Sequence, residues 1–152
     1  MGFLFNFRYP RVLTFVFIAL FSFSASSHEG AVGVVKERMD RFKQSKSDLG
    51  EIRIALRKGE PETAQALALK LAEWGGEMAT HFPEGSNPRP SEALDRIWQD
   101  WPTFEQQIER YTTSAQTMAD LIAEGAPKSS LDKAFKDLGR TCKVCHNRFK
   151  AN

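Results

Sequence analysis

Cysteine is scarce in this chain of 152 residues, which holds only Cys142 and Cys145. Two cysteines cannot build a disulfide scaffold, because such scaffolds need several bridges. A four-ligand structural zinc site would have to recruit His28 or His81, both far away in sequence. These exclusions favour a single small site to which both cysteine sulfur atoms contribute.

The chain also lacks the alternating runs of Val, Ile and Thr, bounded by hairpin signals, that are typical of β-strands. Proline is concentrated in residues 82–90, where three prolines and one glycine occur within nine residues. This composition rules out a continuous helix there. We therefore expect an all-α chain with one long irregular connection.

Long hydrophobic runs are nearly absent. The clearest run, residues 12–21, is too short to span a bilayer, which takes about 20 apolar residues. It follows Arg8 and Arg11 and precedes the small residues Ala25, Ser26 and Ser27. This pattern is typical of a secretory signal. We predict a cleaved signal peptide over residues 1–27, a mature domain over 28–152 and a periplasmic location, with an uncleaved anchor as the alternative.

A net charge of either sign is also missing. Residues 1–27 hold two of the 21 basic residues and none of the 19 acidic ones, so the predicted mature domain carries 19 of each. A formally neutral domain shows no sign of a polyanion-binding surface. Nucleic acid is therefore not an expected partner.

The most informative motif that is present runs from Cys142 to His146 and reads Cys-x-x-Cys-His. On a helix, residues i and i+3 face the same side, so both thiols can form thioethers with the two vinyl groups of one porphyrin. His146 is then placed to ligate the iron. A thioredoxin-like dithiol is the alternative, but it needs a strand–helix setting and has no use for the histidine. The motif predicts one covalently attached haem c.

Apolar residues recur three, four or seven apart over most of the remaining chain, which indicates amphipathic helices. Gly59 is a plausible helix stop, Pro61 and Pro102 suit first-turn positions, and Ser129 or Ser130 can cap the last helix. The expected helices are Val34–Lys58, Pro61–Thr80, one from Pro102 to about Glu124, and one from Ser129 or Ser130 to about Phe149, with a short helical segment between Ser91 and Ile97.

Short first and third connections predict an antiparallel up-down-up-down four-helix bundle. This topology brings the start of the first helix and the end of the last helix to the same end of the bundle. The haem is expected at that end. Side chains of the first helix are then the leading candidates to face the iron from the side opposite His146.

A signal-like start, four helices and a C-terminal haem motif together resemble the cytochrome c′ family, including its methionine-ligated low-spin relatives. The resemblance covers essentially the whole predicted mature chain. It also includes the segments Val34–Phe42, Phe82-Pro83, Ile97-Trp98 and Asn147–Lys150.

The resemblance implies that the residue one turn after Arg38 occupies the distal position over the iron, and that residue is Phe42. Phenylalanine has no lone pair to donate, so the iron would be five-coordinate and open to NO or CO. Met39, with a different helix rotation, or His81 could instead supply a sixth ligand. Phe42 could also simply be a core residue, and Met78 and Met118 are expected to fill gaps in the core.

Arg38 resembles the family's arginine that meets a haem propionate, a favourable pairing of a guanidinium with a carboxylate. The alternative is a solvated helix charge. Lys150 stands one turn after His146, where the family often has an arginine near the proximal face. Lysine keeps the charge but loses the planar fork of hydrogen-bond donors.

The function expected from these observations is one-electron transfer by a periplasmic haem protein that binds NO or CO, with an unidentified redox partner. A six-coordinate electron carrier with a Met ligand and a haem-free helical interaction module are the alternatives. We do not expect an enzyme, because a peroxidase-like activity wants a distal base that the first helix lacks. Apolar positions such as Ile54 or Leu69 on the first two helices are candidate contacts for a homodimer.

Overall fold

The computed structural model describes residues 1–2 and 30–151. The predicted signal peptide and its cleavage site therefore lie almost entirely outside the described residues, as does His28. None of the described helices has a stretch long and apolar enough to span a bilayer.

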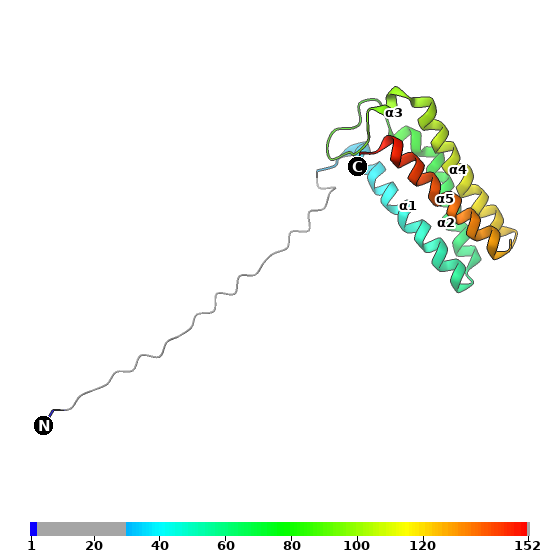
Figure 1. Cartoon of the computed structure of the whole chain (residues 1–152), viewed down its shortest axis with the longest axis horizontal. Coiled ribbons are helices and arrows are strands. Elements are labelled where there is room, and N and C mark those ends of the chain that lie inside the picture. The colour runs from blue at the N-terminus through cyan, green and yellow to red at the C-terminus, as the bar shows by residue number, and fades with distance from the viewer. Residues whose placement is uncertain (3–29, 152) are drawn as a thin grey trace.

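Four long helices form the bundle, and they run antiparallel in chain order (Figure 1). They are α1 (Gly33–Lys58), α2 (Pro61–Glu77), α4 (Trp101–Ala123) and α5 (Lys128–Phe149). A single 3-10 turn, η1 (Met78–His81), and a short helix, α3 (Arg96–Gln99), lie in the long connection. The predicted all-α bundle is confirmed, and the described residues contain no strand beyond an isolated bridge between Ala93 and Lys150.

Local sequence explains the end of α1 and the starts of α2 and α5. Gly59 adopts φ 74°, and its N–H group bonds the carbonyls of Ala55 and Leu56, so α1 stops where glycine was expected to stop it. Pro61 opens α2 as predicted. The prediction that Ser129 or Ser130 caps the last helix is wrong. α5 begins at Lys128 after Pro127, and no side chain caps it. The fixed φ of proline starts this helix instead.

The core is built by three neighbouring pairs: α1 with α2, α2 with α4, and α4 with α5. Its largest fully buried side chains are Ile52, Leu71, Ile97, Phe104, Met118 and Leu138. Gly75 allows α2 to approach α4, because a Cβ atom there would lie 2.2 Å from the hydroxyl oxygen of Thr112. By contrast, α1 and α5 make almost no close backbone contact. This fourth side of the bundle is where the site lies.

The connection between η1 and α4 folds across one end of the bundle (Figure 1). The Leu94 N–H group donates to the Phe149 carbonyl at 3.0 Å, and the Ala151 N–H group donates to the Glu92 carbonyl at 2.8 Å. The Trp98 indole N–H donates to the Phe82 carbonyl at 3.0 Å. The first two bonds tie the long connection to the end of α5 that carries the Cys-x-x-Cys-His motif, and the third joins two parts of the connection.

Candidate haem site

Two adjoining cavities lie between α1 and α5, with volumes of about 270 and 500 Å³. Phe42, Lys46, Cys145 and His146 line both cavities. The smaller one reaches toward the middle of the bundle and is walled mainly by apolar side chains of all four long helices. The larger one lies toward the end that the long connection covers. The larger cavity therefore lies at the end of the bundle where the haem is predicted to bind.

Cys142 and Cys145 sit on adjacent turns of α5 and both line the smaller cavity. Both thiols are unpaired and partly buried. Burial raises the pKa of Cys142, and burial together with Cys142 raises the pKa of Cys145 to about 11. Thiols that stay protonated at neutral pH are poor redox or metal-binding groups. Among the described residues no cluster of three or more His, Cys, Asp and Glu could hold a metal ion.

His146 follows directly and lines both cavities. Partial desolvation and the charge of Lys150 lower its pKa, while the charge of Glu92 partly offsets this shift. A lowered pKa keeps the imidazole neutral, which is the form that ligates a metal ion.

Phe42 faces His146 across the groove, with ring centroids 6.2 Å apart and planes at 78°. The Phe42 ring also packs edge-on against Trp74, with centroids 5.6 Å apart. Phe42 is thus only half-buried, although it belongs to the aromatic cluster. Phe42 therefore packs against the core and also lines both cavities, so the structure is compatible with a distal role and with a core role.

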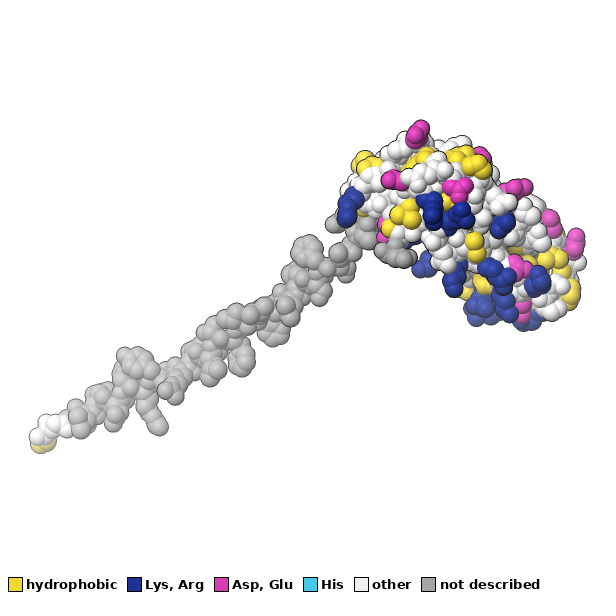
Figure 2. Space-filling model, turned by 45° about the horizontal axis from the view of Figure 1, so that its top comes forward, with side chains coloured by type: hydrophobic (Ala, Val, Ile, Leu, Met, Phe, Trp, Pro, Cys, Tyr) yellow, Lys and Arg dark blue, Asp and Glu magenta, His cyan; other side chains and the backbone are white. Residues whose placement is uncertain are grey.

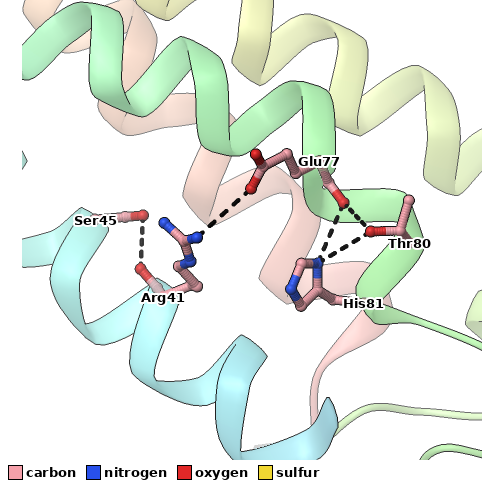
Figure 3. A network of polar contacts seen from close by, with 5 residues as sticks. All are labelled: Arg41, Ser45, Glu77, Thr80 and His81. Atoms are coloured by element: carbon pink, nitrogen blue, oxygen red, sulfur yellow. Dashed lines mark hydrogen bonds and ion pairs between the residues drawn. The ribbon is translucent and has the colours of Figure 1, made fainter.

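The other candidate iron ligands are less well placed. Met39 lines the larger cavity together with Phe42 and His146. His81 lines neither cavity and packs on the Trp74 ring at 4.9 Å between centroids. Its Nδ1 atom lies 3.3 Å from the Glu77 carbonyl and 3.2 Å from the Thr80 hydroxyl (Figure 3). The geometry therefore gives no support to ligation by His81.

Arg38 is buried, with 2% of its surface exposed, so a solvated helix charge is the wrong reading of this residue. Its guanidinium donates to the hydroxyl and carbonyl of Ser86, to the Ser91 hydroxyl at 2.7 Å and to the His81 carbonyl at 3.2 Å. It also lies 4.6 Å from the centre of the Phe82 ring. Burial lowers its pKa. Arg38 lines the larger cavity and at the same time fastens the long connection to α1.

Lys150 lies just past the end of α5, and its N–H group donates to the His146 carbonyl at 3.1 Å. Its ammonium pairs with Glu92 at 2.7 Å, and both residues line the larger cavity. Lys150 therefore lies beside His146 on the wall of the larger cavity. Glu92, a member of the long connection, was not anticipated as its partner.

Tyr111 and Gln107 of α4 are buried polar residues on the wall of the smaller cavity that the sequence did not single out. The Tyr111 hydroxyl has no hydrogen-bond partner among the described residues. Burial raises the pKa of Tyr111 to about 12, although nearby Ser45 partly counteracts the rise. In the sequence, Tyr111 falls on the apolar stripe of its helix, and nothing there distinguishes it from a core residue. A glutamine at a core position was the signal that could have drawn attention to Gln107.

The donor set suits a covalently bound haem. Two thiols at i and i+3 and a neutral imidazole meet in one apolar hollow, and the cationic groups of Arg38, Lys43 and Lys46 stand at its edge. Apolar walls match a porphyrin, and cations match its carboxylates.

A family model described as Cytochrome C′ matches residues 33–150. Cytochrome c′ from Halomonas halodenitrificans is 34% identical over 61 residues, covering 40% of this chain and 46% of that protein. Cytochrome c′ from Rhodospirillum rubrum is 35% identical over 72 residues, covering 47% and 48%. The chain therefore spans about half the length of the curated relatives it matches.

Solved structures share the fold. Cytochrome c prime from Shewanella frigidimarina has a TM-score of 0.70 at 22% identity, covering 78% of this chain and 94% of that one. A ferrous variant of cytochrome c prime from Alcaligenes xylosoxidans with bound NO has a TM-score of 0.67 at 23% identity, also covering 78% and 94%. Together with the family match over the whole bundle, these findings show that the chain belongs to the cytochrome c′ family, with haem c as its covalently bound cofactor.

Proposed function

We propose that the protein is a periplasmic one-electron carrier whose haem iron also binds NO or CO. The observation that carries this proposal is the groove between α1 and α5, in which the Cys-x-x-Cys-His motif lines an apolar cavity and Phe42 faces His146. Bound haem c supplies an iron that cycles between Fe(III) and Fe(II) and takes axial ligands.

The chain's own residues divide the work. Cys142 and Cys145 would hold the porphyrin through thioethers, and His146 would supply a nitrogen ligand to the iron. Phe42 faces His146 and offers no lone pair, so it would leave a coordination position open to a small molecule such as NO or CO. A relative of the same fold was solved with bound NO, which supports this assignment.

Cationic residues at the cavity edge position the propionates in this proposal. Arg38 is the first candidate, because it lines the larger cavity with its guanidinium already held by Ser86 and Ser91. Lys150 contributes its charge on the side of His146. Without a planar guanidinium it gives only a point charge there.

The second candidate function is a six-coordinate carrier without gas binding. It is favoured by one observation, the position of Met39 on the wall of the larger cavity with His146. A Met thioether would occupy the site that we assign to small ligands. A peroxidase-like enzyme is not proposed, because His146 is the only histidine among the described residues that line the two cavities.

Absorption spectra of the oxidised and reduced protein, with and without NO and CO, separate these functions. We expect high-spin bands and a Soret peak that shifts when CO is added to the ferrous protein. A sharp low-spin spectrum with a sulfur-to-iron band and no response to CO would assign the sixth position to Met39.

Location and assembly are part of the same proposal. Export through the predicted signal peptide places the domain where c-type haem is normally attached. A homodimer through α1 and α2 would cover Leu69, which is 42% exposed on α2, whereas Ile54 is half-buried and less available. Fractionation of cells and the mass of the native particle test these two points.

A further inference from the structure

The rim of the groove between α1 and α5 is strongly cationic on both sides. Four basic residues of α1 lie within one narrow stripe, because their spacings of three, seven and four bring them back to the same face of the helix. They are Lys43, Lys46, Arg53 and Arg57. Lys46 lines both cavities and Lys43 the larger one, so this stripe borders the groove.

The facing edge of α5 carries Lys136 and Lys143, seven residues apart, with Gly139 between them on the cavity wall. Contacts at the far end of the groove fix this orientation. The Arg53 guanidinium of α1 lies 5.0 Å from the centre of the Phe135 ring of α5. The two rows of cations therefore stand opposite each other.

These cations are largely uncompensated. Lys43, Lys46, Lys136 and Lys143 take part in no ion pair within the described part of the chain, although most other exposed lysines of the two helices do. The acidic residue of α5 nearest this rim, Asp132, pairs with Lys128 and also interacts electrostatically with Lys136 and Arg53, so the rim is partly compensated at that end. The stripe of α1 itself contains no acidic residue.

The rim is positive because of where the charged side chains lie, and not because basic residues outnumber acidic ones. Residues 28–152 contain equal numbers of basic and acidic side chains. Exposed carboxylates such as Glu62 and Glu73 on α2 and Glu105 and Glu109 on α4 belong to helices outside the two rows. Glu92 lines the larger cavity, where it is paired with Lys150. Figure 2 shows Lys and Arg side chains gathered along the lower edge of one face of the bundle. Of the rim residues, Lys43 and Lys46 line the cavities, so positive charge borders the groove there.

We propose that this rim is the docking surface for an acidic patch on a protein redox partner. The inference rests on the proposed function, because haem held in the groove would have its edge at this rim. Positive potential concentrated around that edge raises the rate at which an anionic surface finds it, by about 10-fold to 10³-fold at low salt. Gly50 and Gly139 stand beside the rim, and a Cβ at either would meet nothing within 4 Å, so the centre of the surface is open.

The test uses the ferrous holoprotein and two small electron acceptors of opposite charge, hexacyanoferrate(III) and a cationic cobalt(III) phenanthroline complex. Each takes one electron from Fe(II), leaving Fe(III). The triple variant Arg57→Glu, Lys136→Glu, Lys143→Glu changes exposed rim residues that line neither cavity. It is compared with Arg89→Glu, Arg96→Glu, Arg110→Glu, which changes the charge equally at exposed positions outside α1 and α5. Stopped-flow rates are measured at low and high salt, with reduction potentials recorded for each variant.

At low ionic strength we expect the rim variant to react about tenfold more slowly with hexacyanoferrate(III) and several-fold faster with the cobalt complex. The control variant should change both rates by less than threefold, and high salt should remove the difference. Equal rates in the two variants, at unchanged potentials, would overturn the docking surface. A protein without a Soret band would instead refute the proposed function.

A second measurement identifies the kind of partner. Chemical-shift changes on adding a polyglutamate peptide should map to α1 and α5 around the groove and disappear in the rim variant. Binding to phosphatidylglycerol vesicles, lost in the same variant and without peptide binding, would overturn the proposal and assign the rim to a membrane surface.

Discussion

Phe42 is the residue on which the ligand chemistry depends. Its ring lies 6.2 Å from that of His146, on the wall of both cavities, and it cannot donate electrons to a metal. We expect Phe42→Met to place a thioether there, convert the ferric spectrum to a low-spin form and weaken CO binding at least tenfold. Phe135→Met is the matched control, because Phe135 is half-buried on α5 and lines neither cavity. An unchanged high-spin spectrum in Phe42→Met would remove Phe42 from the distal position.

Tyr111 makes stability depend on alkaline pH. Its pKa is raised to about 12 by burial, above the value of about 10 in an unfolded chain. A group whose folded pKa is raised keeps its full contribution below pH 10 and loses it as pH rises toward 12. Between pH 9 and pH 11 the unfolding free energy of the wild type should fall by about 1.4 kcal/mol more than that of Tyr111→Phe. Urea unfolding at the two pH values measures this, and parallel losses in both proteins would contradict the assignment.

The close approach of α2 and α4 depends on a single glycine. A Cβ at Gly75 would collide with the Thr112 hydroxyl at 2.2 Å and crowd the Tyr111 ring at 3.1 Å. Gly75→Ala should therefore lower the free energy of unfolding by about 1–3 kcal/mol. Gly76→Ala is the control, because a Cβ there meets nothing and alanine favours a helix by about 1 kcal/mol. If urea midpoints move in the same direction in both variants, helix propensity and not packing governs this interface.

The long connection is held to α1 by Arg38, whose guanidinium bonds Ser86, Ser91 and the His81 carbonyl. Arg38→Lys keeps the charge but loses most of these bonds, so we expect about 2 kcal/mol less stability and faster amide hydrogen exchange in residues 83–95. Arg41→Lys serves as the control. Arg41 is exposed, and its guanidinium lies 3.6 Å from the Glu77 carboxylate (Figure 3). Weakening this ion pair should lower the free energy of unfolding by less than about 1 kcal/mol. Equal exchange rates in wild type and Arg38→Lys would show that the connection is held by other contacts.

At the scale of the whole molecule, sequence periodicity was enough to predict the bundle. Four amphipathic stripes, Gly59 and Pro61 fixed the helices to within a few residues, because these signals are local. The motif from Cys142 to His146 located the site at one end for the same reason. The family resemblance added Phe42, which the groove geometry supports as a facing residue.

Contacts between distant segments could not be predicted in this way. Arg38 gave no sign in the sequence that it binds Ser86 and Ser91, because its partners lie in an irregular loop without periodicity. The sequence also did not predict that basic residues of α1 and α5 face each other, because a formally neutral composition says nothing about where charges lie. Both features depend on which helix faces become neighbours, and this is decided by packing.

Intact mass spectrometry of the exported protein tests the central claim most directly. We predict the mass of the chain without residues 1–27 plus one haem, no thiols available for alkylation, and a haem-bearing peptide that contains Cys142 and Cys145. The variant Cys142→Ser, Cys145→Ser should show the mass of the polypeptide alone. A wild-type protein with the bare polypeptide mass and two alkylated thiols would contradict the account.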